Sequence, residues 1–205
     1  MTANIERLRN SEAQFVGLGI KFERINAVDG RSLSKKEIKN VYDAKINGYR
    51  ARNPLVASEI GCYLSHIEVW KEIAKGNSEG GFIFEDDFKA SSDLRALMEL
   101  LSEDTGNWDM VKLFSLDANP KYFDRRPLGP DHIIVTPYKV PNCTIGYVLK
   151  KSAAQRLLDC SIPFFFFFQA EHRFFWLFVL QGALVVPSPI TIGDQQTTTG
   201  TINED

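Results

Sequence analysis

The sequence predicts an α/β protein with a mainly parallel central sheet. Strand-like and helix-like segments alternate along the chain, and the strongest apolar strand is followed directly by acidic residues. With 205 residues, of which 44% are hydrophobic and 24% charged, the chain is long enough to bury one substantial core. We expect one domain over residues 1–192, followed by a polar, Thr/Gly-rich tail over residues 193–205 whose composition favours disorder.

The part of the chain before residue 57 carries weak signals. They predict a helix, a strand, a capped helix and a loop, in this order: Ser11–Ile20, Phe22–Val28, Ser34–Tyr42 and Lys45–Pro54. The first segment fits helical periodicity poorly, whereas the second alternates as a strand should and ends in an Asp29-Gly30 turn. Ser34 and Glu37 match a capping box, which indicates where the third segment begins its helix.

The clearest helix and the clearest strand are neighbours in the sequence. Ser58 is a good N-cap, and apolar residues recur after it at helical spacing until Gly76 ends the helix. The short apolar run Gly81–Phe84 is typical of a buried central strand. Later segments predict a helix, a strand, an edge strand, a strand and a helix, in this order: Ser92–Glu103, Trp108–Phe114, Asp131–Val140, Thr144–Leu149 and Ser152–Leu158. Because ligands gather at the carboxyl ends of parallel strands, we expect a site directly after Phe84.

Charge, cysteine content and hydropathy exclude several classes of protein. The 24 basic and 26 acidic residues nearly cancel, so no strong field draws the chain onto nucleic acid. Cys62, Cys143 and Cys160 form no CxxC pair, which argues against a disulfide framework or a cysteine zinc site and favours the cytoplasm. The N-terminus lacks a signal-peptide pattern, and the most apolar stretch, residues 162–168, is too short to span a bilayer. We expect a soluble protein or one in peripheral contact with a membrane.

The acidic triplet Glu85-Asp86-Asp87 is the candidate metal site. A strand that ends in this triplet places two or three carboxylates together, where their repulsion is costly unless a divalent cation or basic groups offset it. Such carboxylates bind Mg²⁺ or Mn²⁺, and in an enzyme that uses a nucleotide-sugar donor the ion neutralises the diphosphate leaving group. The alternative is a solvated acidic turn, which the triplet alone does not exclude.

Two motifs in this order resemble glycosyltransferase family 25. They are the helix sequence EIGCYLSHIEVW at residues 59–70 and, after a short spacer, FIFEDDF at residues 82–88. Three further pieces agree in order, namely residues 22–30, the sequence TIGY at residues 144–147, and the helix at residues 153–158. The family contains bacterial lipooligosaccharide galactosyltransferases and resembles the collagen galactosyltransferases.

The resemblance implies a GT-A type fold, a UDP-sugar donor that is usually UDP-galactose, and a saccharide acceptor. It implies a Mn²⁺ or Mg²⁺ ion held by Asp87 and Asp86, with Glu85 either as a further ligand or as a residue that orients its neighbours. His66, in the "SH" of the helix motif, would contact the phosphates or the sugar of the donor or take a catalytic role. The alternative for His66 is a buried histidine bonded to a carbonyl group.

Residues 169–176 combine a carboxylate, an imidazole and a guanidinium with aromatic side chains, which is a set suited to binding sugar and phosphate. Glycosyl transfer with inversion needs a general base for the acceptor hydroxyl, and Glu171 is the first candidate. Arg173 is the candidate contact to the donor. The alternative for Glu171, His172 and Arg173 is a charged helix face packed by the aromatic residues beside it.

The chain departs from the family pattern in two places. Family members usually begin with an apolar strand before an arginine-containing helix that resembles residues 6 onward, and this chain begins without that strand. A late start codon, a truncated gene and a variant that manages without the strand all stay open. Relatives also carry an Asp after a Pro where Pro163 is followed here by five phenylalanines, Phe164–Phe168. We expect much of this run to be buried or to contact a lipid-linked acceptor.

Three hypotheses for the function follow. The first is an inverting hexosyltransferase, specifically a galactosyltransferase, that extends a lipid-linked oligosaccharide of lipopolysaccharide or lipooligosaccharide at the cytoplasmic face of a bacterial inner membrane. The second is a truncated, non-catalytic protein of the same fold that binds a saccharide or a partner. The third is a phosphohydrolase that uses the same carboxylates and metal, which would release inorganic phosphate from simple phosphoesters.

Overall fold

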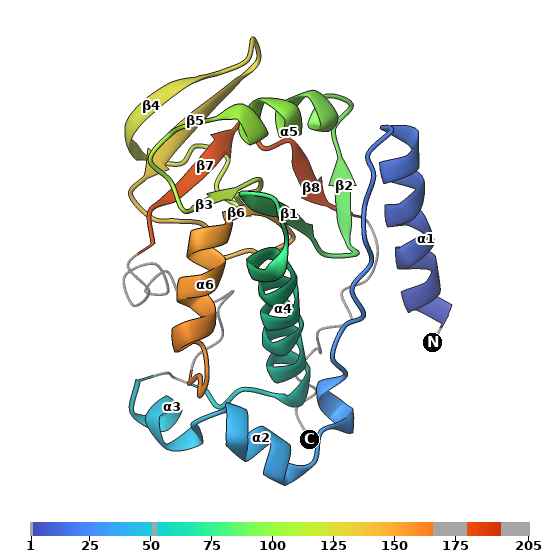
Figure 1. Ribbon diagram of the computed structural model, residues 1–205, viewed down its shortest axis with the longest axis vertical. Helices are drawn as coiled ribbons and strands as arrows, with labels where there is room; N and C mark the ends of the chain where they lie inside the picture. The colour runs from blue at the N-terminus through green and yellow to red at the C-terminus, as the bar shows by residue number, and fades with distance from the viewer. Residues whose placement is uncertain (1, 51–52, 166–179, 194–205) are drawn as a thin grey trace.

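The computed structural model describes residues 2–50, 53–165 and 180–193, and Figure 1 shows their arrangement. The α-helices of these ranges are α1 (Thr2–Gly17), α2 (Lys35–Val41), α3 (Ala44–Arg50), α4 (Ala57–Lys75), α5 (Leu94–Glu103) and α6 (Lys151–Cys160). A single 3₁₀ turn in the described chain, η1, spans Gly30–Ser32. Helix α1 stands at one side of the molecule, next to a short strand pair (Figure 1).

Most described strands form one six-stranded sheet in the order β1-β6-β3-β7-β5-β4. In that order across the sheet, the strands span Gly80–Phe84, Gly146–Lys150, Met110–Lys112, Gly182–Val186, His132–Pro137 and Tyr122–Leu128. Two further strands, β2 (Phe88–Ala90) and β8 (Ile190–Ile192), pair with each other in antiparallel direction. The acidic triplet therefore lies in the link between the end of β1 and the start of β2.

The prediction of a mainly parallel sheet is wrong, although the α/β class is confirmed. Among the described strands of the six-stranded sheet, β3 and β7 pair in parallel and every other neighbouring pair is antiparallel. The alternation of strands and helices does place β1 and β3 in the same direction, because both run antiparallel to β6. The alternation of strands and helices predicts the relative direction of β1 and β3 but not which strands are neighbours in the sheet. It could therefore not show that β6 lies between them.

Helices cover both faces of the sheet and enclose two hydrophobic cores. Helices α4 and α6 pack on one face and α5 on the other (Figure 1). Strand side chains alternate between the two cores, so Tyr147 and Leu149 of β6 face α4 and α6 whereas Val148 faces α5. In the same way, Met110 of β3 faces α4 and α6 whereas Val111 faces α5. One face of the sheet thus presents Tyr147 to α4.

Residues 22–28 form no strand, so that prediction is wrong. The segment is irregular chain: at its start the Phe22 ring stacks on Phe15 of α1 with centroids 5.1 Å apart, and at its end the Val28 N–H donates to Ser65 Oγ of α4 at 2.9 Å. Gly30 meets Gly61 at the same place, and a Cβ atom added to Gly61 would lie 2.6 Å from the Val28 carbonyl oxygen. Two separate pieces of the family pattern are therefore in contact, and both glycines are required by this close approach of backbones.

Several other elements differ from prediction in their bounds or kind. Helix α1 begins well before the predicted segment 11–20, and α3 occupies part of the predicted loop 45–54. The N-cap of α4 is Val56, whose N–H donates to the Glu59 carboxylate at 2.9 Å, while Ser58 lies inside the helix. Strand β5 is not the edge strand, because the unpredicted strand β4 pairs with it on the outside.

The remaining predicted elements overlap the observed ones. The capping box at α2 is confirmed, since the Ser34 N–H donates to Glu37 Oε2 at 2.8 Å and the Glu37 N–H donates to Ser34 Oγ at 3.3 Å. Strands β1, β3 and β6 and helices α4, α5 and α6 all overlap their predicted segments. None of the helices in the described ranges combines the length and the apolar character that a bilayer crossing requires.

Replacing Leu97 with Ala tests the core between α5 and the sheet. Leu97 is 2% exposed, so the cavity should lower the free energy of unfolding by about 2–5 kcal/mol in urea titrations. The matched control is Leu100→Ala on the same helix, where the side chain is 38% exposed and the loss should stay below about 1 kcal/mol. Equal losses in the two variants would contradict this packing.

Candidate functional site

The end of β1 is fixed by backbone hydrogen bonds on each side of the acidic triplet. The Glu85 N–H donates to the Ile145 carbonyl at 3.0 Å, which continues the pairing of β1 with β6 by one residue. The Asp87 carbonyl accepts from the Gly193 N–H at 2.7 Å, where the chain leaves β8. The carboxylates therefore project from a segment held between both sheets.

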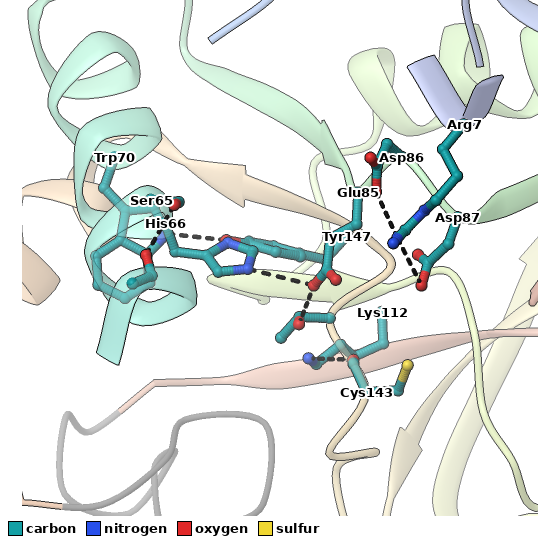
Figure 2. A network of polar contacts seen from close by, with 12 residues as sticks. Arg7, Ser65, His66, Trp70, Glu85, Asp86, Asp87, Lys112, Cys143 and Tyr147 are labelled. Atoms are coloured by element: carbon teal, nitrogen blue, oxygen red, sulfur yellow. Dashed lines mark hydrogen bonds and ion pairs between the residues drawn. The ribbon is translucent and has the colours of Figure 1, made fainter. Parts of the chain in front are cut away.

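Glu85 points toward α4 and away from the other two carboxylates (Figure 2). Its Oε1 atom accepts a short hydrogen bond from Thr144 Oγ1 and lies 3.3 Å from His66 Nε2. Burial raises the pKa of Glu85, but these hydrogen bonds and the charges of His66 and Lys112 outweigh it and hold the pKa below its ordinary value. Glu85 is thus an ionised carboxylate in a fixed orientation.

A chain of hydrogen bonds runs from Trp70 to Glu85. Trp70 Nε1–H donates to the Tyr147 hydroxyl at 2.9 Å, and that oxygen lies 2.9 Å from His66 Nδ1. The Tyr147 O–H can donate to Nδ1 while His66 Nε2–H donates to Glu85, so both ring nitrogens have a side-chain partner. His66 is only 4% exposed. The structure therefore places it as a buried link between Tyr147 and Glu85, bonded to side chains rather than to a carbonyl group.

Lys112 of β3 brings a buried cation next to this chain. Its ammonium donates to the Cys143 carbonyl at 2.8 Å and lies 5.4 Å from the centre of the Tyr147 ring. Burial lowers the pKa of Lys112 to about 8, although the charge of Glu85 opposes this shift. In its protonated form the lysine offsets part of the negative charge of Glu85.

Asp86 and Asp87 face α1 instead, where they share one arginine (Figure 2). Arg7 Nη2 lies 2.5 Å from Asp86 Oδ1 and 3.2 Å from Asp87 Oδ2. Burial and the charge of Glu85 raise the pKa of Asp87 above its ordinary value, although Arg7 opposes the shift. The Oδ1 atom of Asp87 is buried and has no hydrogen-bond partner among the described residues.

Two groups of side chains at this strand end could ligate a cation. Asp86 and Asp87 offer carboxylate oxygens, which suit Mg²⁺ and Mn²⁺, and the unpartnered Asp87 oxygen fits a further ligand. Cys62, His66 and Glu85 bring sulfur, nitrogen and oxygen within 4.8 Å of one another, a set that suits zinc. Burial and the charge of Glu85 raise the pKa of the Cys62 thiol, which disfavours the thiolate. The Asp86–Asp87 pair is the better fit to Mg²⁺ or Mn²⁺.

The structure adds side chains to which the sequence analysis assigned no role. They are Arg7, Trp70, Lys112, Thr144 and Tyr147. Thr144 and Tyr147 stand in the TIGY motif and Trp70 in the helix motif, so the motifs themselves contained a signal for three of them. Nothing in the sequence linked Arg7 or Lys112 to the triplet, because that proximity arises from tertiary packing.

Some predicted residues lie outside the described part of the chain. Glu171, His172 and Arg173 belong to this group, as do residues 166–168 of the phenylalanine run and the tail from residue 194. Phe164 is described and is 3% exposed, stacked on the Tyr63 ring with centroids 4.2 Å apart. The expectation of burial is therefore confirmed for the first phenylalanine of the run.

Comparison with known proteins now identifies the family. The sequence model described as "Glycosyltransferase family 25 (LPS biosynthesis protein)" matches residues 1–168, which include every side chain of the site described above. The chain belongs to glycosyltransferase family 25. The helix motif, the acidic triplet and the TIGY strand, which this structure brings together around Glu85, all lie within the matched region.

The relatives within family 25 include a protein named as a galactosyltransferase and a protein named as inactive. A glycosyltransferase 25 family member of Aedes aegypti is 27% identical over 160 residues, which cover 75% of this chain and 26% of the relative. Human procollagen galactosyltransferase 2 is 28% identical over 152 residues, with 71% and 24% coverage. The human inactive glycosyltransferase 25 family member 3 is 30% identical over 141 residues, with 65% and 23% coverage. The matched region thus spans about a quarter of each of these relatives.

Replacing Tyr147 with Phe tests the buried hydrogen-bond chain. The change removes the buried hydroxyl that accepts from the Trp70 indole N–H and contacts His66 Nδ1, so the free energy of unfolding should fall by about 1–3 kcal/mol. Tyr138→Phe is the control, because Tyr138 is 58% exposed and its loss should stay within about 0.5 kcal/mol. Urea unfolding followed by fluorescence measures both. A Tyr147→Phe variant as stable as the control would refute the proposed chain.

Proposed function

We propose that this chain forms the donor-binding part of a metal-dependent hexosyltransferase that moves galactose from UDP-galactose to a saccharide acceptor. One observation carries the proposal: within the family 25 match, Asp86 and Asp87 stand together at the end of β1 with a buried carboxylate oxygen that lacks a hydrogen-bond partner in the described structure. Such a pair suits a divalent cation that carries a diphosphate. Membership of a glycosyltransferase family supports the same class of reaction.

The roles of the three carboxylates differ in this proposal. Asp86 and Asp87 hold Mn²⁺ or Mg²⁺, which when bound supplies positive charge against the nucleoside diphosphate leaving group. Glu85 stays ionised and is held by His66 and Thr144, so it can accept hydrogen bonds from hydroxyl groups of the transferred sugar. His66 then acts through Glu85 as a positioning residue. Glu171 remains the candidate general base and Arg173 the candidate second contact to the donor.

The acceptor that we propose is a lipid-linked oligosaccharide of lipopolysaccharide or lipooligosaccharide. It is supported by the description of the matching family as an LPS biosynthesis protein, and galactose by the name of human procollagen galactosyltransferase 2. A lipid-linked acceptor would bring the enzyme to the cytoplasmic face of a bacterial inner membrane as a peripheral protein. Transfer to a purified lipooligosaccharide, detected by mass spectrometry, tests this part separately.

A second candidate function is saccharide or partner binding without transfer. It is favoured by the 30% identity to the human relative named inactive. The two functions differ in turnover rather than in fold. An enzyme releases UDP from UDP-galactose in the presence of Mn²⁺ and acceptor, whereas a non-catalytic protein binds a ligand and releases none. Quantifying UDP over time with and without acceptor therefore separates them.

Replacing Asp87 with Asn tests the metal and donor site. The variant loses one charged ligand, so UDP should bind about tenfold more weakly or worse in the presence of Mn²⁺, which corresponds to about 1.4 kcal/mol. Isothermal titration of UDP measures the effect. Adding EDTA to the unmodified protein should weaken UDP binding in the same direction, because the carboxylates alone repel the diphosphate.

Asp104→Asn is the matched control for this titration. Asp104 and Asp87 are similarly shielded, with side chains 10% and 12% exposed, and each pairs with an arginine. Asp104 precedes β3 whereas Asp87 follows β1. Because the two strands run in the same direction, the two residues lie beyond opposite ends of the strands. UDP affinity that is independent of Mn²⁺, or that falls equally in both variants, would refute the proposed site.

A further inference from the structure

Arg7 already occupies the place of a cation between Asp86 and Asp87. Its Nη2 atom contacts a carboxylate oxygen of each residue, at 2.5 Å and 3.2 Å (Figure 2). The Asp86 side chain is 44% exposed, whereas those of Arg7 and Asp87 are 10% and 12% exposed, so the contact of Arg7 with Asp87 is the one largely shielded from water. Contacts between charged groups in such surroundings are stronger than the same contacts at an open surface. Arg7 is therefore a substantial counter-charge for the acidic pair.

Helix α1 holds Arg7 in this position through a row of residues on one face. Ser11 Oγ donates to the Asp86 carbonyl at 2.9 Å. Gln14 donates to the Phe88 carbonyl at 3.0 Å and accepts from the Ala90 N–H at 2.7 Å. Arg7, Ser11 and Gln14 are spaced by four and three residues, so they share one side of the helix. The guanidinium is thus delivered by an element that is docked on the backbone on both sides of Asp87.

The chemistry of the guanidinium allows a metal ion to displace Arg7 from the two carboxylates. Arginine stays charged and has no lone pair, so it cannot ligate a metal that is bound to the same oxygens. A divalent ion on Asp86 and Asp87 would also repel Arg7 at short range. The planar donor fork of arginine matches phosphate oxygens as well as carboxylates. A diphosphate brought to this place by the metal would offer Arg7 new acceptors beside the old ones.

We propose that Arg7 competes with the divalent cation for Asp86 and Asp87 in the donor-free protein and binds the diphosphate of the nucleotide donor once the metal is held there. This inference rests on the proposed function above. It makes Arg7 a binding residue with two opposite effects. The guanidinium weakens binding of the metal alone, and it strengthens binding of the nucleoside diphosphate together with the metal.

Arg7→Gln tests the inference through two affinities that must move in opposite directions. Mn²⁺ binding without nucleotide, followed by the electron paramagnetic resonance signal of free Mn²⁺, should tighten about fivefold because the competing cation is gone. UDP binding at saturating Mn²⁺, measured by titration calorimetry, should weaken about tenfold because charge-assisted hydrogen bonds to the diphosphate are lost. A purely structural arginine would weaken both affinities or change neither, and either result overturns the inference.

Two further variants complete the experiment. Arg126→Gln removes the guanidinium that pairs with Asp104 and should leave both affinities unchanged. Arg7→Lys keeps the charge but not the fork, so Mn²⁺ affinity should stay near that of the unmodified protein while UDP binding weakens. This variant also decides the matter if Arg7→Gln fails to fold, because unchanged UDP affinity in Arg7→Lys would contradict a phosphate contact through the fork.

The controls separate this inference from the function on which it rests. If the unmodified protein binds neither Mn²⁺ nor Mn²⁺-dependent UDP, the proposed function fails and the role of Arg7 fails with it. If the unmodified protein binds both, but the two affinities do not move apart in Arg7→Gln, the proposed function stands and only the role of Arg7 is overturned.

Discussion

Glu85, Asp86 and Asp87 bring three carboxylates to the end of one strand, and their mutual repulsion is the constraint that the surrounding structure has to meet. The compensation comes from separate elements, because no single neighbour could face all three side chains. Helix α4 supplies His66, β3 supplies Lys112, and α1 supplies Arg7. The packing of each element against the sheet therefore has an electrostatic as well as a hydrophobic consequence.

The insertion of β6 between β1 and β3 is what makes this compensation possible. Its Tyr147 pairs with Ile83 of β1 on one side and with Lys112 of β3 on the other. The Tyr147 side chain then faces α4, where it meets His66 and Trp70. A purely parallel β1–β3 neighbourhood would lack this residue between them. The departure from a parallel sheet is thus directly linked to the fixed orientation of Glu85.

Much of the fold could be predicted from local patterns, and most of what failed depended on tertiary contacts. The α4 periodicity, the capping box at Ser34 and the apolar run before Glu85 are local signals, and the structure contains all three elements. The alternation of residues 22–28 is also a local signal, but no neighbouring strand in the described structure pairs with it, so it forms irregular chain that runs from α1 to α4. Strand β4 was missed because its burial pattern is that of a mostly exposed edge.

The candidate site shows the same division between local and tertiary information. The apolar run before Glu85 placed Glu85, Asp86 and Asp87 correctly at the end of a strand. The sequence motifs could not show that Glu85 turns toward His66 while its two neighbours turn toward Arg7, because that separation depends on where α1 and α4 dock. An acidic triplet that forms one motif in the sequence is therefore divided in space into a carboxylate fixed by His66 and Thr144 and a pair that shares Arg7.

The buried Oδ1 atom of Asp87 bears on whether Asp86 and Asp87 bind a ligand or only contribute to the stability of the fold. A buried oxygen without a hydrogen-bond partner costs about 1–3 kcal/mol of stability unless a ligand, an ion or a water molecule meets it, so Asp87 Oδ1 is a position where a ligand atom fits. This holds for both functions considered above, since a catalytic and a non-catalytic protein could each bind a metal and a nucleotide here. Binding and transfer are separable for that reason: the groups of this site face the donor, whereas transfer also needs a base at the acceptor. The described geometry thus favours ligand binding at Asp86 and Asp87 more strongly than it favours turnover.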